Sequence, residues 1–220
     1  MNPKADGPPR TPAFIWVLGL LVVVAVWLAW QRYQTGGRDE LERWQSQPLD
    51  LEAIRVGLDQ PERARRGHAL VQFAMRVGER RAAKTSQSDL VPFFKPVAAQ
   101  LSSNDREIRN LAIMALAYLQ APGVEAAVRP LLQDSDPNVA LNAALALAAR
   151  GDPRGAPLIA EALAGTRLDQ TQARYELLRA LAPVTGPDQK SLLQSQLDRA
   201  QLDRDEALAQ LCRQTLERLD

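Results

Sequence analysis

Two side chains in this sequence have the chemistry needed for catalysis, and each is the only one of its type. His68 is the single histidine and Cys212 is the single cysteine. A general acid or base needs a hydrogen-bonding partner and a pocket, and a reactive thiol needs nearby cations that lower its pKa. His68 lies between arginines and apolar residues of a predicted helix, and nothing in the sequence places a cation-rich pocket around Cys212. We therefore predict that both are structural, that the protein has no catalytic residue, and that it is not an enzyme.

Paired aspartates recur between the predicted helices, at Asp134/Asp136 and at Asp203/Asp205. An aspartate just before a helix accepts hydrogen bonds from its first N–H groups and favours the positive end of the helix dipole. A calcium loop would need more oxygen ligands and a glycine at its sharp turn, which these segments lack. The chain also has neither a CxxC pair for zinc nor a CxxCH motif for haem. The pairs are therefore predicted to be helix caps, and no metal, cofactor or small-molecule substrate is expected.

A run of basic residues precedes the repeated part of the chain and could form a docking face. At 100° per residue its members fall within an arc of about 160° on one helix. Two interpretations stay open, a solvated helix face and a docking surface for anionic headgroups or an acidic partner. Nucleic acid is not an expected partner, because no aromatic stacking platform accompanies the charges and the balance of 27 basic and 26 acidic residues leaves a net charge of only +1. This predicted basic patch consists of Arg63, Arg65, Arg66, Arg76, Arg80, Arg81 and Lys84.

The elements that carry these residues follow a repeated pattern. Residues 108–116 read IRNLAIMAL after Asp105, and residues 139–147 read VALNAALAL after Asp136, an offset of 31 residues. Weaker copies lie at residues 173–181 and 208–216, and a degenerate copy lies at residues 61–101. Self-similarity at this period predicts stacked helical pairs, because one pair cannot bury its apolar face without the next.

Apolar spacing and caps predict an all-α chain with no sheet. In the helix predicted from residue 60 to residue 78, small residues recur at intervals of three and four and are expected to form the packing face, namely Ala64, Gly67, Val71, Ala74 and Gly78. The predicted helices span residues 50–58, 60–78, 88–101, 105–119, 124–132, 136–150, 156–163, 169–181, 188–197 and 203–219.

The repeat unit resembles a known family. An aspartate, an apolar residue three positions on, an arginine, small residues and Ala-Leu precede a second apolar helix, with Gly151-Asp152-Pro153 as the turn between helices. This pattern resembles the HEAT repeat and is closest to the short bacterial variety named after phycobilisome lyases, although Ala140 stands where arginine is usual. The resemblance covers roughly residues 61–220 and implies an α-solenoid of about four helical pairs. It also implies that the second helices line an inner surface, where a partner would touch Glu125, Arg129, Gln133, Arg154 and Glu161.

Ahead of the repeats lies an apolar segment that is typical of a membrane span. Residues 13–30 form 18 consecutive positions without a charged or polar side chain, which as a helix reach about 27 Å. Aromatic rings at both edges fit the membrane interface, and the sequence after the run is a poor signal-peptide cleavage site. We therefore predict an uncleaved single-pass transmembrane helix over residues 13–34, with Trp16, Trp27, Trp30, Arg32 and Tyr33 at the membrane interface.

The predicted domain organisation follows from these segments. Residues 1–12 contain four prolines and are expected to be a disordered tail, residues 35–60 a linker with capping helices, and residues 61–220 the solenoid. Basic residues flank the apolar segment on both sides, at Lys4 and Arg10 and at Arg32, Arg38 and Arg43, so their number does not decide the orientation. We favour a bacterial inner membrane location with the N-terminus inside and the solenoid on the periplasmic side.

The function predicted from these features is that of a membrane-anchored, non-catalytic scaffold or adaptor, an accessory or assembly subunit of a larger membrane protein complex. Tethering raises the effective concentration of the scaffold for membrane-borne partners. Two alternatives stay open. One is a lyase-like enzyme that attaches a chromophore, as the name of the repeat variety suggests. The other is an envelope chaperone that binds its clients transiently.

Overall fold

The computed structural model describes residues 48–165 and 171–219. The chain divides into two compact units, Met1–Pro48 and Leu49–Asp220, and the described residues belong almost entirely to the second. The predicted tail at 1–12, the predicted span at 13–34 and its interface residues Trp16, Trp27, Trp30, Arg32 and Tyr33 lie outside the described residues. Among the helices that are described, none combines the length and the apolar character needed to span a bilayer.

Every regular element in the described ranges is helical, as the sequence predicts. The α-helices are α2 (Leu51–Leu58), α3 (Arg63–Ala82), α4 (Phe94–Ala99), α5 (Arg106–Leu116), α6 (Val124–Val128), α7 (Pro137–Ala148), α8 (Ala156–Gly165), α9 (Thr171–Leu181), α10 (Lys190–Leu202) and α11 (Glu206–Glu217). Short 3-10 segments extend or join them: η1 (Val91–Phe93), η2 (Gln100–Ser102), η3 (Arg129–Gln133), η4 (Pro153–Gly155), η5 (Ala182–Val184) and η6 (Pro187–Gln189).

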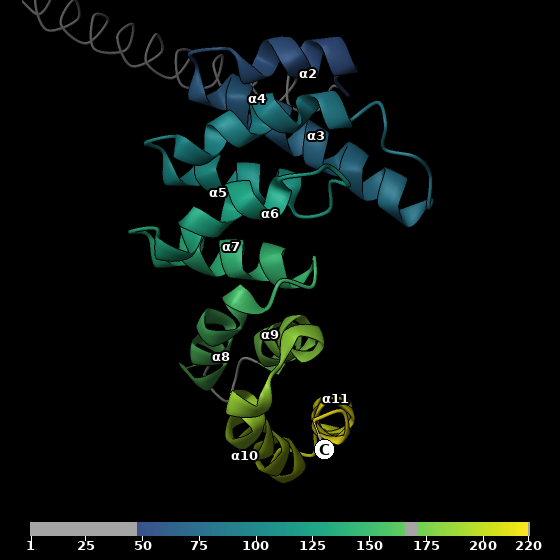
Figure 1. Ribbon diagram of the computed structural model, residues 1–220, viewed down its shortest axis with the longest axis vertical. Coiled ribbons are helices and arrows are strands. Elements are labelled where there is room, and N and C mark those ends of the chain that lie inside the picture. The colour runs from purple at the N-terminus through teal and green to yellow at the C-terminus, as the bar shows by residue number, and fades with distance from the viewer. Residues whose placement is uncertain (1–47, 166–170, 220) are drawn as a thin grey trace, which may run out of the picture. The chain divides into compact units, whose positions relative to one another are not determined.

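The first helices of successive pairs pack against one another in chain order. Helix α3 packs against α5, α5 against α7, and α7 against α9, while α4, α6 and α8 follow as second helices (Figure 1). Helix α2 covers the free side of α3, and α10 packs against α11 at the other end. This order of packing is consistent with the predicted solenoid of stacked helical pairs. The degenerate copy at residues 61–101 also contains two helices, α3 and α4.

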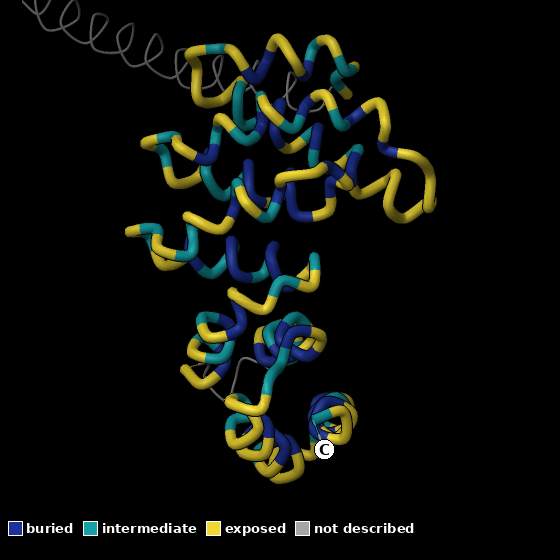
Figure 2. Tube along the Cα trace, viewed as in Figure 1, coloured by how far each residue is buried: buried dark blue, intermediate teal, exposed yellow. Residues whose placement is uncertain are grey.

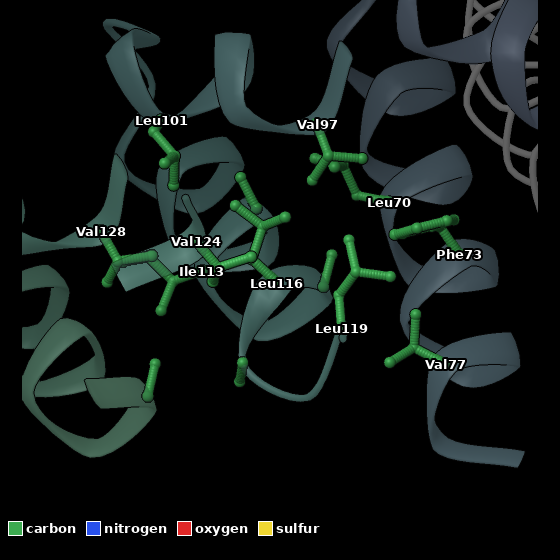
Figure 3. Packing of buried hydrophobic residues seen from close by; sticks show 14 of the residues in the cluster. Leu70, Phe73, Val77, Val97, Leu101, Ile113, Leu116, Leu119, Val124 and Val128 are labelled. Atoms are coloured by element: carbon green, nitrogen blue, oxygen red, sulfur yellow. The ribbon is translucent and has the colours of Figure 1, made fainter. Parts of the chain in front are cut away.

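Two hydrophobic clusters form the interior. The first gathers residues from α2 to α7, and Figure 3 shows its packing around Leu70 and Phe73 of α3, Val97 of α4, and Leu116 of α5. The second gathers residues from α7 to α11. Burying a leucine or valine side chain completely is worth about 1.5–3 kcal/mol, so each interface between successive helices contributes substantially to stability.

Helix α7 contributes to both clusters. Ala143 and Leu147 belong to the first, while Ala144 and Ala148 belong to the second. The middle of α7 is correspondingly buried on nearly all sides (Figure 2). An alanine-rich helix suits this position, because small side chains let neighbours approach from both sides.

Close approach is most evident where η4 meets α7. A Cβ atom added at Gly155 would lie 2.6 Å from the Ala144 carbonyl oxygen and 2.7 Å from its Cα. Glycine is therefore required by contact between two backbones. The preceding turn ends α7 with Gly151 at φ +80°, where the Asp152 N–H donates to the Leu147 carbonyl at 3.0 Å, and Asp152 then accepts from the Arg154 N–H. The predicted role of Gly151-Asp152-Pro153 as the turn between helices is confirmed.

Of each predicted pair of capping aspartates, the second member is confirmed as a helix cap. Asp50, Asp105, Asp136 and Asp205 each accept a hydrogen bond from a first-turn N–H of the following helix. Asp134 and Asp203, the first members of the two predicted pairs, serve a different purpose. Each accepts from an arginine of an earlier helix, Asp134 from Arg109 and Asp203 from Arg174. These contacts tie one repeat to the next, which local sequence rules do not reveal.

Helix α3 differs most from its prediction. It runs through Gly78 and ends at Ala82, with Lys84 at φ +52° and the Thr85 N–H donating to the Arg80 carbonyl at 2.9 Å. Its buried residues include Leu70, Phe73 and Val77, while Ala64, Val71 and Gly78 of the predicted small-residue face are exposed. The predicted packing face was wrong for these three residues, because burying large apolar side chains is worth more than close approach of small ones. Ala74, by contrast, packs against the first hydrophobic cluster.

Candidate interaction groove

The seven residues of the predicted basic patch have different surroundings in the described structure, and their role as a docking face stays a prediction. Most of them contact acceptors that lie close by in the fold. Arg63 contacts Asp105, the cap of α5, and Glu107 in its first turn, and Arg80 lies 2.9 Å from Asp89. Arg66 donates to the Gln60 and Pro61 carbonyls, and Arg76 donates to the Leu49 carbonyl. Arg65 and Lys84 are exposed. The remaining member, Arg81, stacks on a tyrosine.

The five predicted partner-contact residues lie along α6, η3, η4 and α8. Arg129 and Arg154 both approach Asp152, at 3.7 Å and 3.2 Å, and Gln133 is exposed on η3. Glu161 lines a cavity of about 520 Å³ together with Asp134 and Ala140, among others. Ala140 is the residue that stands where the repeat usually carries arginine. Glu125 alone lies on the larger groove described below. Their role as partner contacts stays a prediction.

His68 and Cys212 lie far apart in the fold. His68 is a buried residue of α3, whose apolar residues belong to the first hydrophobic cluster, whereas Cys212 on α11 belongs to the second. Burial raises the pKa of the Cys212 thiol to about 11, so it is a neutral thiol at physiological pH. Nothing in the described structure brings these two residues to one pocket, and a lyase mechanism that relies on both has no geometric support there.

Two adjoining cavities form a groove where the C-terminal ends of α3, α5 and α7 approach α9. They measure about 470 Å³ and 250 Å³ and share three lining residues, Arg81, Tyr118 and Ala149. We call this the Arg81–Tyr118 groove. The larger cavity is lined in addition by Leu145, Ala148, Gly151, Glu176, Leu177, Arg179, Ala180 and Pro183, and the smaller by Ala117, Gln120, Glu125 and Arg150.

Tyr118 is held in the groove by contacts on two sides of its own turn. The buried Gln87 side chain donates to the Tyr118 carbonyl at 3.3 Å and accepts from the Gln120 N–H at 2.8 Å. On the other side, Arg150 donates to the Leu119 carbonyl at 2.8 Å. The loop after α3 and the residue after α7 therefore both form hydrogen bonds with this turn, so the position of the tyrosine depends on three successive repeats.

The charged residues of the groove are mostly paired. Arg150 lies 2.6 Å from Glu125, and Arg179 lies 2.6 Å from Glu176. A hydrogen bond from its own backbone N–H lowers the pKa of Glu125, burial opposes this, and Arg150 lowers the pKa further. The Glu176 carboxylate raises the pKa of Arg179. Within each ion pair, the charge of the arginine is largely compensated by that of the glutamate.

Arg81 is the exception among these charges. Its guanidinium carbon lies 3.7 Å from the centroid of the Tyr118 ring, a cation–π contact. In the part of the chain that the structure describes, no carboxylate forms an ion pair with it. Stacking covers one face of the guanidinium and leaves its edge, which carries the N–H donors, for another acceptor.

Sequence reasoning singled out Arg81 and Glu125 and missed the rest of the groove. Met114 and Tyr118 are four residues apart on α5 and the turn after it, outside the buried stripe, and remain 58% and 41% exposed. Large apolar residues on the solvent side of a helix often mark interaction surfaces, so this spacing was the available signal. Gln87 gave no local signal, because its two partners are more than 30 residues away.

The groove has the features of a small binding site. The groove offers an apolar floor from α7 and α9, an exposed tyrosine and paired charges at its rim, which is how small binding sites in proteins are generally built. Within residues 48–165 and 171–219, no three histidine, cysteine, aspartate or glutamate side chains are grouped closely enough to hold a metal ion.

Comparison with known proteins identifies the repeat. Residues 94–182 match the family model described as HEAT repeats. Neither the curated proteins nor the solved structures give a match. The matched segment contains the helices from α4 to α9 and nearly all of the groove. Helix α3 before it, and α10 and α11 after it, pack onto the matched helices or onto each other beyond the match. Residues 94–182 are therefore similar to HEAT repeats.

Proposed function

We propose that this protein is a membrane-anchored, non-catalytic scaffold that binds a partner protein in the Arg81–Tyr118 groove. HEAT repeats point to protein interaction as the general role. The observation that carries the proposal is the groove itself, in which the ends of successive first helices place an exposed tyrosine beside an apolar floor. A partner that fills it would contact several repeats at once and would therefore depend on their correct stacking.

The membrane part of the proposal rests on sequence. The apolar residues 13–30, with aromatic residues at both edges, support an anchor at 13–34. We place the solenoid on the periplasmic side of a bacterial inner membrane, as an accessory or assembly subunit of a larger membrane complex. Protease digestion of spheroplasts tests the orientation. Cleavage of the solenoid in intact spheroplasts supports it, and protection until the membrane is broken refutes it.

The scaffold role is tested by purifying the full-length protein with its partners in mild detergent. Ala149 is exposed and lines both cavities, so Ala149→Trp fills the groove without disturbing the core. The matched control is Ala207→Trp, at an exposed alanine of α11 that lines neither cavity. The proposal expects a stoichiometric partner with the native protein and the control, and its loss with Ala149→Trp. A partner retained by Ala149→Trp would place binding elsewhere, and sub-stoichiometric, transient clients would indicate a chaperone instead.

A further inference from the structure

The charges of the Arg81–Tyr118 groove leave one cation without a counterion. Arg150 and Arg179 each have a carboxylate at 2.6 Å, whereas Arg81 has only the Tyr118 ring in the described part of the chain. The groove therefore carries three guanidinium groups and two carboxylates, an excess of one positive charge.

Backbone carbonyls at the ends of α3 and α7 have partners within the chain. The end of α3 is closed by the Thr85 N–H, which donates to the Arg80 carbonyl at 2.9 Å, and α7 is closed by the Asp152 N–H at 3.0 Å from the Leu147 carbonyl. The Arg81 guanidinium itself makes no hydrogen bond to a carbonyl in the described part of the chain, so its N–H donors are available. A guanidinium edge matches the two oxygens of a carboxylate, and such pairs form the stronger hydrogen bonds of protein surfaces.

The floor of the groove supplies the second requirement. Leu145 and Ala148 of α7 and Leu177 and Ala180 of α9 line the larger cavity, whose volume of about 470 Å³ lies within the range of small binding sites. Apolar side chains here have no polar group to offer, so an apolar side chain of the partner would be favoured over a polar one.

We propose that the groove recognises an acidic segment of its partner protein, which places an aspartate or glutamate carboxylate on Arg81 and a neighbouring apolar side chain on the floor. This inference rests on the proposed scaffold function and specifies the chemistry of the partner. The stacked Tyr118 ring holds the guanidinium in place, so less side-chain freedom is lost when the carboxylate binds.

The test is a selection from a display library of random peptides on the full-length protein in detergent micelles. Enriched peptides are synthesised, labelled and titrated by fluorescence anisotropy against the native protein, Arg81→Gln and Arg65→Gln. Arg65 is the matched control, because it is an exposed arginine of the same helix that lines neither cavity. Versions of each peptide with glutamine in place of glutamate are titrated in parallel.

The expected result is enrichment of peptides with a carboxylate beside an apolar residue. Arg81→Gln should lower the affinity for these peptides at least tenfold, whereas Arg65→Gln should change it by less than twofold. Peptides with glutamine in place of glutamate should bind the native protein and Arg81→Gln with the same affinity. Failure to enrich acidic peptides, equal effects of both substitutions, or no enrichment at all would overturn the inference. The scaffold proposal would survive each of those results if Ala149→Trp still released the co-purified partner, so the two can fail separately.

Discussion

Replacing Arg109 by methionine should lower the free energy of unfolding by about 3 kcal/mol, because it breaks a largely buried bond between two repeats. Arg109 binds Asp134 through two hydrogen bonds, Nε to Oδ2 and Nη2 to Oδ1, each 2.8 Å long. The side chains are only 13% and 7% exposed. A hydrogen bond to a charged group contributes about 1.5–3 kcal/mol net, and methionine retains most of the apolar contact of the arginine stem.

The assay is urea unfolding of the full-length chain, followed by far-ultraviolet circular dichroism. Arg106→Met is the control on the same helix, since Arg106 pairs with Asp136 at 3.1 Å but is 65% exposed. Arg106→Met should lower the free energy of unfolding by less than about 1 kcal/mol. A cycle of Arg109→Met, Asp134→Asn and the double variant should give a coupling of about 2 kcal/mol. A coupling below about 0.5 kcal/mol, or equal losses for both arginines, would refute the assignment of this contact as a major link between repeats.

The same pair predicts a pH dependence. Burial raises the pKa of Asp134, but the hydrogen bonds from Arg109 and the Asp136 amide, together with the Arg109 charge, outweigh burial and leave it lowered. A carboxyl group whose pKa is lower in the folded chain than in the unfolded chain stabilises the fold at pH values above its unfolded pKa of about 3.9. This stabilisation is lost as the pH falls through the pKa of the folded state. The stability difference between native protein and Arg109→Met should therefore be full at neutral pH and shrink below about pH 4. A difference that stays constant down to pH 2 would contradict this.

Three further predictions follow from packing. Gly155→Ala should lower the free energy of unfolding in urea by roughly 1–3 kcal/mol, because the added Cβ would meet the backbone of Ala144. Gly78 lies in the exposed part of α3, where an added Cβ would meet nothing within 4 Å, so Gly78→Ala should raise the free energy of unfolding by about 0.5–1 kcal/mol. Cys212, fully buried with a pKa of about 11, should react with a thiol reagent only after urea unfolds the chain, and rapid reaction in native buffer would refute its burial. Gln87→Leu leaves two backbone groups of the turn after α5 without their partner, so it should cost about 1–3 kcal/mol and increase amide hydrogen exchange in that turn.

The helices and their repetition were predictable because the signals that produce them are local. Asp105 and Asp136 each cap the helix that follows, and apolar residues three and four positions apart form its buried side. Even Pro130, for which the sequence predicts a bend or a late helix start, has a local effect. Its missing N–H leaves α6 as an α-helix to Val128 and continues the chain as the 3-10 segment η3.

The candidate groove was only partly predictable, because its residues come from different repeats. Arg81 stood out as a charge, but its contact with Tyr118 joins residues of two successive helical pairs. The basic patch was inferred from angular spacing alone, which says nothing about acceptors that other helices bring to each arginine. Arg63 illustrates this, since its partners are on α5.

The sequence by itself determined that this protein is helical, that its helices repeat at a spacing of about 31 residues, and where most of them begin. Hydrogen bonds between residues four positions apart and caps at helix ends account for these features. Only the tertiary structure decided that Asp134 binds Arg109, that α7 is buried on two sides, and that Arg81 lies over Tyr118. These contacts depend on how closely one helical pair approaches the next, and that distance is set by side-chain packing across the interface, which no local pattern encodes.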